Sequence, residues 1–210
     1  MSKEKKLNKL SYALGLSLGQ SMAGTGVEKE SLDFDDFLLG IKDVFDDVEF
    51  RISAEEGSQL LKTYFNKIQK NAEEANRLAN EVRLKKAEDY LKENAHKPGV
   101  KVTESGLQYK VIQEGGIMQW PNVHSRVRVH YEGRLTDGTV FDSSYDRGKP
   151  SEFNLDQVIP GWSEGVCLMK PGAKYEFTIP PSLGYGENGV PGHIDGNSVL
   201  VFTVELLDIL

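Results

Sequence analysis

The stretch between Ser53 and Pro98 constrains the fold more than any other part of the chain. Apart from Gly57, no glycine or proline interrupts it. Ser53 and Glu56 match the capping box that begins many helices, and Pro98 predicts where the helix ends. We therefore predict one helix over residues 53–96, roughly 60 Å long at 1.5 Å per residue. Because its apolar stripe thins in the second half, we expect the first half to pack and the second half to stand in solvent.

Two shorter helices are predicted before the long one. The first carries leucines at helical spacing over about residues 7–22, and the second begins near Asp33, a suitable N-cap residue. With the start of the long helix they predict an all-α N-terminal domain, residues 1–70. A domain of about 70 residues buries only a limited fraction of its surface alone. We expect a second copy of the chain to complete it as a homodimer; alternatively, the helices cover the second domain.

From about residue 101 the pattern changes from helical to alternating. In the segment VRVHYEGRLTDGTVFDSS, residues 127–144, the side chain of Tyr131 shares one face with two valines. Asp137-Gly138 predicts a hairpin turn, and the returning strand places Phe141 next to Asp142. A carboxylate beside aromatic side chains is costly to bury without partners. This hairpin therefore predicts the edge of a binding pocket.

The remaining pattern predicts an antiparallel β-sheet wrapped around one short α-helix. Trp162, Val166 and Met169 have the spacing of one apolar helix face, while further strands alternate near residues 175–179 and 199–210. Trp162 can lie in a plain apolar core or form the floor of an aromatic pocket. Together with the helical half, this predicts an α+β protein whose second domain spans residues 101–210.

Composition excludes several function classes. The net charge of −7 argues against nucleic acid and anionic membrane surfaces as main partners. No run approaches the roughly 20 apolar residues of a membrane span. A single cysteine cannot form an internal disulfide, and the four histidines show no metal-ligand spacing, so we expect no metal site. We expect a cytoplasmic chain as written, or a periplasmic or surface protein if Met1 replaces a removed leader.

Four segments of the second half resemble the FKBP-type peptidyl-prolyl cis-trans isomerases. They are VHYEGRLTDGTVFDSSYDRGKP from Val129, VIPGWSEGV from Val158, the GYG of residues 184–186, and LVFTVELLDI from Leu200. The resemblance covers about residues 101–210. The helical half, with SYALGLSLG from Ser11, is similar to the N-terminal dimerisation module of the macrophage infectivity potentiator-like members.

The resemblance implies roles for individual residues. Asp142, Tyr185 and Ile159 would be catalytic: Ile159 would offer its backbone N–H to a substrate carbonyl, and Tyr185 its hydroxyl. Asp142 would be held by two neighbours at the polar end of the pocket. The substrate-binding residues would be Tyr131, Phe141, Arg147, Phe153, Val158, Trp162, Ile194 and Phe202. Ser151 stands where many relatives have an aromatic residue at the pocket rim.

The resemblance also implies an activity and partners. The expected reaction is isomerisation of X-Pro bonds in folding proteins, with chaperone activity as a dimer. No covalent bond breaks in this reaction, so no cofactor is expected. Proline-containing polypeptides and unfolded clients would be the substrates, and macrolide immunosuppressants are candidate ligands. The rival hypothesis is a holdase chaperone or adaptor that binds proline-containing segments without significant catalysis.

Overall fold

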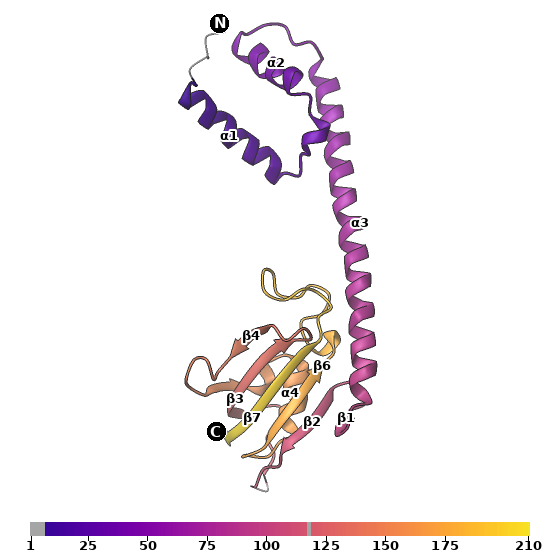
Figure 1. Cartoon of the computed structure of the whole chain (residues 1–210), viewed down its shortest axis with the longest axis vertical. Coiled ribbons are helices and arrows are strands. Elements are labelled where there is room, and N and C mark those ends of the chain that lie inside the picture. Colours follow the sequence, from indigo (N-terminus) through magenta and orange to yellow (C-terminus); the bar gives the residue numbers. More distant parts are fainter. Residues whose placement is uncertain (1–6, 117–118) are drawn as a thin grey trace, which may run out of the picture. The chain divides into compact units, whose positions relative to one another are not determined.

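The computed structural model describes residues 7–116 and 119–210 (Figure 1). The chain divides into two compact units, Met1–Asn76 and Arg77–Leu210, and the boundary falls inside the long helix α3, Ala54–Ala95. The predicted α+β class is confirmed. The domain boundaries predicted from the sequence stay predictions, and the first six residues of the predicted 1–70 domain lie outside the described residues. No helix in the described parts is long and apolar enough to cross a membrane.

The first unit is helical, and its helices begin where the sequence predicts. It contains α1 (Lys9–Gly24), the 3-10 turn η1 (Lys29–Ser31), α2 (Phe34–Phe45) and the beginning of α3. The Asp33 carboxylate caps α2 by accepting the N–H groups of Asp35 and Asp36, at 2.9 and 3.1 Å. The Ser53 hydroxyl accepts the N–H of Glu56 at 3.1 Å, which confirms the predicted cap of α3.

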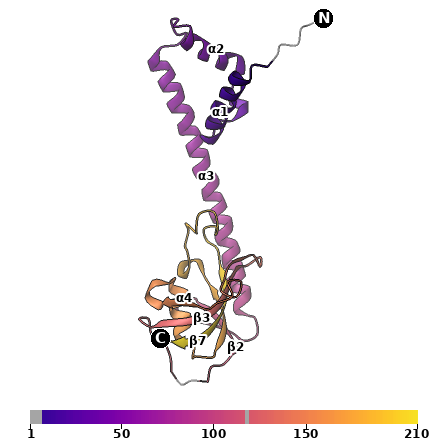
Figure 2. The same ribbon diagram turned by 90° about the vertical axis from the view of Figure 1, so that its left-hand side faces the viewer.

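The first unit has almost no core within a single chain. Of residues 7–76, only Asp43 is buried, and it is paired with Arg51 at 2.9 Å. Helix α1, which Figure 2 shows from a second side, has no buried residue. Leu10 and Leu14 on this helix are 71% and 64% exposed. The apolar stripe predicted from the sequence is therefore present but uncovered.

The second unit is built on one seven-stranded antiparallel sheet. Its strands are β1 (Val100–Val102), β2 (Gln108–Gln113), β3 (Arg126–Leu135), β4 (Val140–Ser143), β5 (Ser151–Asn154), β6 (Lys174–Ile179) and β7 (Leu200–Ile209). Their order is β1-β2-β6-β7-β3-β4. Strand β4 pairs with residues 132–134 of β3, and β5 pairs with residues 126–129 of the same strand. The short elements are η2 (Leu155–Gln157), α4 (Pro160–Cys167) and η3 (Pro181–Leu183).

The sheet curves around α4, as predicted (Figures 1 and 2). Trp162 is 4% exposed, and Val166 and Met169 are fully buried. Opposite them, Phe177 of β6 and Leu206 of β7 are also fully buried. Burial of these side chains on both sides of the interface supplies the main stabilising free energy of the unit.

The last turns of α3 are fixed to the sheet by a buried polar network. The Asn94 amide donates to the side-chain oxygens of Gln108 and Thr178, at 2.9 and 3.2 Å. The Gln108 amide in turn donates to the carbonyl of Leu91 at 2.8 Å. All three polar side chains are buried, as is Ala87. The prediction that the second half of this helix stands in solvent is therefore wrong for its last turns. These turns contact the sheet through Ala87 and the Asn94 amide, and not through an apolar stripe that the sequence pattern would show.

Candidate active site

A cavity of about 470 Å³ opens between the concave side of the sheet, the beginning of α4 and the loop before β7. Its lining residues are Tyr131, Phe141, Asp142, Phe153, Gln157, Val158, Ile159, Trp162, Tyr185, Val190, His193, Ile194 and Phe202. The structure thus brings together every site residue proposed from the sequence except Arg147, which is not in the lining but contacts two residues that are. Cavities of this size and apolar character typically hold small ligands or single side chains.

Trp162 lies at the centre of the aromatic lining. The rings of Tyr131, Phe153 and Phe202 lie 5.1, 5.5 and 5.4 Å from the Trp162 ring, each in an edge-to-face arrangement. Such T-shaped contacts are the favoured geometry for aromatic pairs. The two readings of Trp162 are therefore not exclusive, because it is both buried in the core and part of the pocket lining.

The wall of the cavity formed by Phe141 and Phe202 depends on Gly133, a glycine in β3. A Cβ atom on Gly133 would lie 2.6 Å from the Phe202 ring and 2.8 Å from the Phe141 ring, which is closer than real contacts allow. The missing side chain lets these two rings meet edge to face, with 5.5 Å between their centroids. Any larger residue at this position would push the wall into the cavity.

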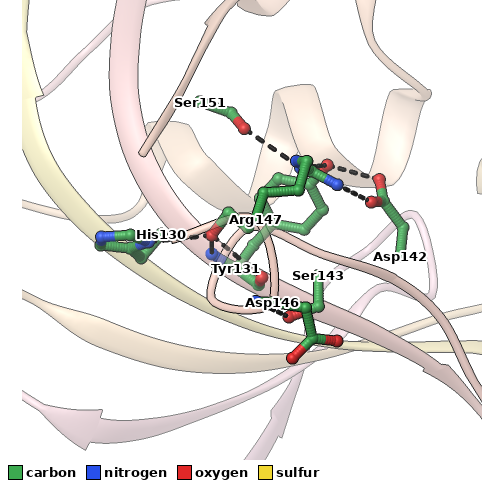
Figure 3. A network of polar contacts seen from close by, with 8 residues as sticks. His130, Tyr131, Asp142, Ser143, Asp146, Arg147 and Ser151 are labelled. Atoms are coloured by element: carbon green, nitrogen blue, oxygen red, sulfur yellow. Dashed lines mark hydrogen bonds and ion pairs between the residues drawn. The ribbon is translucent and has the colours of Figure 1, made fainter. Parts of the chain in front are cut away.

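One carboxylate stands at the polar edge of this aromatic pocket (Figure 3). Asp142 accepts hydrogen bonds from the Tyr131 hydroxyl and from the Arg147 guanidinium. Arg147 also donates to the Tyr131 hydroxyl at 2.9 Å and to the Ser151 hydroxyl at 3.2 Å. The Asp142 carboxylate therefore has the partners that a carboxylate beside aromatic side chains needs. The Arg147 guanidinium is in turn held by the Ser151 hydroxyl.

The electrostatics of this cluster favour a charged Asp142 between neutral tyrosines. Partial burial raises the pKa of Asp142, but hydrogen bonds from Tyr131 and Arg147 outweigh it, so the pKa lies below its ordinary value. Burial, and then the hydrogen bond to Asp142, raise the pKa of Tyr131 above its ordinary value. Burial, and then the nearby Asp142 charge, raise the pKa of Tyr185. Both hydroxyls therefore remain donors at neutral pH.

The backbone of Tyr131 is fixed from behind by a buried hydroxyl. Ser144, which is fully buried, accepts the Tyr131 N–H at 2.8 Å, and its hydroxyl oxygen lies 2.9 Å from Nδ1 of His130. The Ser144 N–H donates to the Tyr131 carbonyl at 2.9 Å. The tyrosine that positions Asp142 is thus held at both its main chain and its hydroxyl.

Ile159 and Tyr185 offer further hydrogen-bond donors to the cavity. Ile159 is the N-cap of α4, and its carbonyl accepts the N–H groups of Trp162 and Ser163 at 2.9 and 3.1 Å. Within residues 7–116 and 119–210, its own N–H has no acceptor. Tyr185 is 39% exposed and lines the cavity. Both groups are available to a ligand carbonyl.

Sequence reasoning missed three lining residues: Gln157, Val190 and His193. Gln157 ends η2, and the other two lie in the loop before β7. Polar or isolated residues in loops carry no periodic signal from which a place in a pocket could be predicted. Among the described residues, no group of three or more histidine, cysteine or acidic side chains is placed to hold a metal ion.

Two families match the chain. The FKBP-type peptidyl-prolyl cis-trans isomerase family matches residues 119–207. The family described as the domain amino terminal to FKBP-type peptidyl-prolyl isomerase matches residues 7–111. The two matches together span almost the whole chain, in the order that the sequence resemblance implied.

Individual relatives match over nearly the whole of this chain. The FKBP-type isomerase FkpA of Aeromonas hydrophila is 46% identical, covering 94% of this chain and 74% of the relative. The 22 kDa FKBP-type isomerase of Escherichia coli is 43% identical, covering 95% of this chain and 94% of the relative. The crystal structure of Escherichia coli FkpA matches with a TM-score of 0.77 at 38% identity, covering 99% of this chain and 98% of the other.

Proposed function

The chain belongs to the FKBP-type peptidyl-prolyl cis-trans isomerases, and we propose that its aromatic pocket binds a proline ring of an unfolded polypeptide against Trp162. The observation that carries this assignment is a cavity lined mainly by aromatic and aliphatic side chains, with a single ion-paired carboxylate, Asp142, at its edge. A proline ring is apolar and compact, and it fits a lining made of aromatic faces.

Such a pocket can accelerate isomerisation without a nucleophile. An X-Pro bond rotates over a barrier of about 18–20 kcal/mol that comes from amide resonance. In the twisted transition state the amide loses its charge-separated character. Removal of water disfavours the charge-separated planar form, so the twisted form is favoured. A thousand-fold acceleration requires about 4 kcal/mol.

Three polar groups would hold the twisted amide. The free N–H of Ile159 would donate to one substrate carbonyl, and the Tyr185 hydroxyl would donate to a second one. Asp142, fixed by its partners, would orient the polar end of the chain that leaves the pocket. Donors placed in advance cost no reorganisation when the bond twists.

The test is a proline-peptide isomerisation assay on matched variants. Trp162→Leu should lower kcat/KM by about tenfold or more, and Asp142→Asn by about fivefold, corresponding to roughly 1–1.5 kcal/mol of lost transition-state stabilisation. Trp120→Leu is the matched control, because Trp120 is 49% exposed and lies outside the cavity lining. Wild-type protein that fails to accelerate isomerisation would overturn the assignment.

A homodimer formed through the first unit is part of the proposal. Residues 7–76 bury only Asp43, and leucines of α1 are largely exposed. A helix with an uncovered apolar face needs a partner. A second copy of the same unit would supply one and would present two pockets to one client, which supports a chaperone role.

The rival function is a holdase that uses the pocket only to bind. It predicts that suppression of client aggregation survives Asp142→Asn and depends on the apolar face of α1. The isomerase proposal predicts that refolding limited by proline isomerisation slows in step with the peptide activity of each variant. Macrolide binding tests the pocket separately. Ser151, which contacts Arg147, stands where many relatives have an aromatic residue, and we expect it to weaken macrolide binding.

A further inference from the structure

The loop before β7 contains a closed flap, which we define as residues 186–197. The Asn197 N–H donates to the carbonyl of Gly186 at 2.8 Å and closes its base. Near its tip, Val190 and Ile194 exchange backbone hydrogen bonds at 2.7 and 2.9 Å. The two sides of the flap are therefore joined at the base and again near the tip.

Between these points, the two sides of the flap cross in close contact. A Cβ atom on Gly196 would lie 1.8 Å from the carbonyl oxygen of Glu187, and one on Gly189 would lie 2.1 Å from that of Ile194. Only glycine permits this approach, and Gly189 also has a positive φ of 62°. Because of these close contacts and backbone hydrogen bonds, the flap moves as one body. A contact that restrains one of its residues therefore restrains the others.

The flap faces the pocket with Val190, His193 and Ile194, and it contacts the long helix through Asp195. Ile194 is 6% exposed and lines the pocket. The side chain of Asp195 points away from it, and its Oδ2 lies 3.5 Å from Nε of Arg83 on α3. The Arg83 guanidinium is oriented by a second contact, because it donates to the Asn80 amide oxygen at 3.2 Å.

This ion pair crosses a cavity. About 310 Å³ of space separates the flap, the β3–β4 turn and α3, lined among others by Arg83, Lys86, Asp137 and Asp195. The flap therefore does not rest on the helix through tight packing at this point. The helix is firmly placed, because Asn94 and Ala87 of the same unit fix its last turns to the sheet.

We propose that Arg83 is a positioning residue of the isomerase, which holds the flap through Asp195 so that Ile194 closes the proline pocket. The inference rests on the proposed function of that pocket. It makes the end of α3 a working part of the site, although no residue of α3 lines the pocket.

The expected effect is on binding more than on turnover. A loosened flap lowers the fraction of molecules with a closed pocket, and the apparent affinity falls by that fraction. The Asp142 network lies on the β3–β4 hairpin, outside the flap, and keeps its position. The Tyr185 carbonyl accepts the Gly189 N–H at 3.2 Å, but the Gly186 N–H donates to the Pro181 carbonyl at 2.9 Å and anchors this end of the loop. Because the Asp195 side chain is 75% exposed, water screens the ion pair, and we expect KM to rise only about two- to fivefold with kcat nearly unchanged.

The experiment compares Arg83→Gln with Arg77→Gln in the full chain. Arg77 is on the same helix and forms an ion pair with Glu81 at 2.7 Å, so both variants remove one paired charge. Arg83→Glu opposes Asp195 directly and should raise KM further, whereas the Arg83→Glu, Asp195→Arg double variant should restore it. Steady-state kinetics on a proline tetrapeptide and ¹⁵N relaxation of the flap amides are the readouts.

The proposal requires three results together. Arg83→Gln must raise KM and increase flap motion, Arg77→Gln must do neither, and the exchanged pair must recover both. Equal values for Arg83→Gln and Arg77→Gln, or a double variant no better than Arg83→Glu, would overturn it. If wild-type protein has no isomerase activity, the proposed function fails, while the relaxation data still decide whether Arg83 holds the flap.

Discussion

The hydroxyl of Tyr131 donates a hydrogen bond to the carboxylate of Asp142, from one strand of the β3–β4 hairpin to the other. Gly133 is the direct register partner of Asp142, so Tyr131 reaches it diagonally on the same face. Diagonal cross-strand neighbours lie within reach of aromatic side chains. The hairpin itself therefore fixes the carboxylate before any substrate binds.

Removal of this hydroxyl should weaken catalysis without destroying the pocket. In Tyr131→Phe, Asp142 keeps Arg147 as its partner but loses one donor, worth roughly 1 kcal/mol for a hydrogen bond to a charged group in a partly exposed site. We expect kcat/KM to fall about fivefold. Tyr109→Phe makes the same chemical change on β2, where the ring stacks on Tyr175 outside the pocket, and should leave the activity unchanged.

The contribution of Asp142 to stability should depend on pH. Its pKa is lower in the folded protein than in the unfolded chain, because hydrogen bonds from Tyr131 and Arg147 outweigh the opposing effect of burial. The stabilisation is therefore complete above the unfolded pKa of about 4 and is lost as pH falls through the folded value. Urea unfolding should show a free-energy gap between wild type and Asp142→Asn that narrows on acidification. A gap that widens would contradict this assignment.

The Tyr145 hydroxyl should lose its proton at a higher pH than an ordinary tyrosine. Burial, and then the neighbouring Glu205, raise the pKa of Tyr145 to about 12, and its hydroxyl donates to Glu205 at 3.1 Å. Since the folded pKa is raised, the stabilisation is present below the unfolded pKa of about 10 and is lost as pH rises through the folded value. In a titration followed by tyrosinate absorbance, Tyr145→Phe should remove amplitude from the last step. Loss of amplitude near pH 10 instead would show that Glu205 does not hold the hydroxyl.

The Asn94 network should contribute measurably to stability. Asn94→Ala leaves Gln108 and Thr178 buried with fewer partners, and an unsatisfied buried polar group costs about 1–3 kcal/mol. Glu88→Ala, at an exposed position of the same helix within the second unit, should change the unfolding free energy by less than about 0.5 kcal/mol. Chemical denaturation of the second unit, followed by tryptophan fluorescence, measures both. Equal effects for the two variants would mean that the helix end contributes little.

The dimer should depend on the apolar face of α1. Leu14→Glu places a charge in the proposed interface, so sedimentation velocity should show a shift from twice the 23.4 kDa chain mass toward one chain. Lys9→Glu introduces the same side chain on the opposite face of the helix and should leave the dimer intact. The peptide activity of both variants should remain, because the pocket lies in the second unit. Wild-type protein that sediments as one chain at micromolar concentration would refute the homodimer.

Local patterns predicted local structure well. The alternation of Val127, Val129 and Tyr131 gave the buried face of β3, and Asp137-Gly138 gave the turn after Leu135. Helix caps at Asp33 and Ser53 were also confirmed. These features depend on neighbours within a few residues, and a single sequence contains that information.

Features that depend on distant partners were not predicted. The pairing of β3 with both β5 and β7 joins segments far apart in the chain, and no periodicity encodes it. The docking of Asn94 was missed because a polar residue on a charged helix looks exposed until its acceptors are known. Gln157 was missed for a similar reason. Its place in the pocket lining depends on the path of the backbone and not on its residue type.

The buried amide of Asn94 has a practical consequence for anyone who wishes to isolate the proline pocket for ligand screening. A fragment that begins after the helix would carry Gln108 and Thr178 without their donor and would lose the arginine beside the flap. A fragment from Arg77 would retain both. The same requirement applies to gene fusion in evolution. A rearrangement that joined this pocket to another domain would have to include the last turns of α3 together with the sheet.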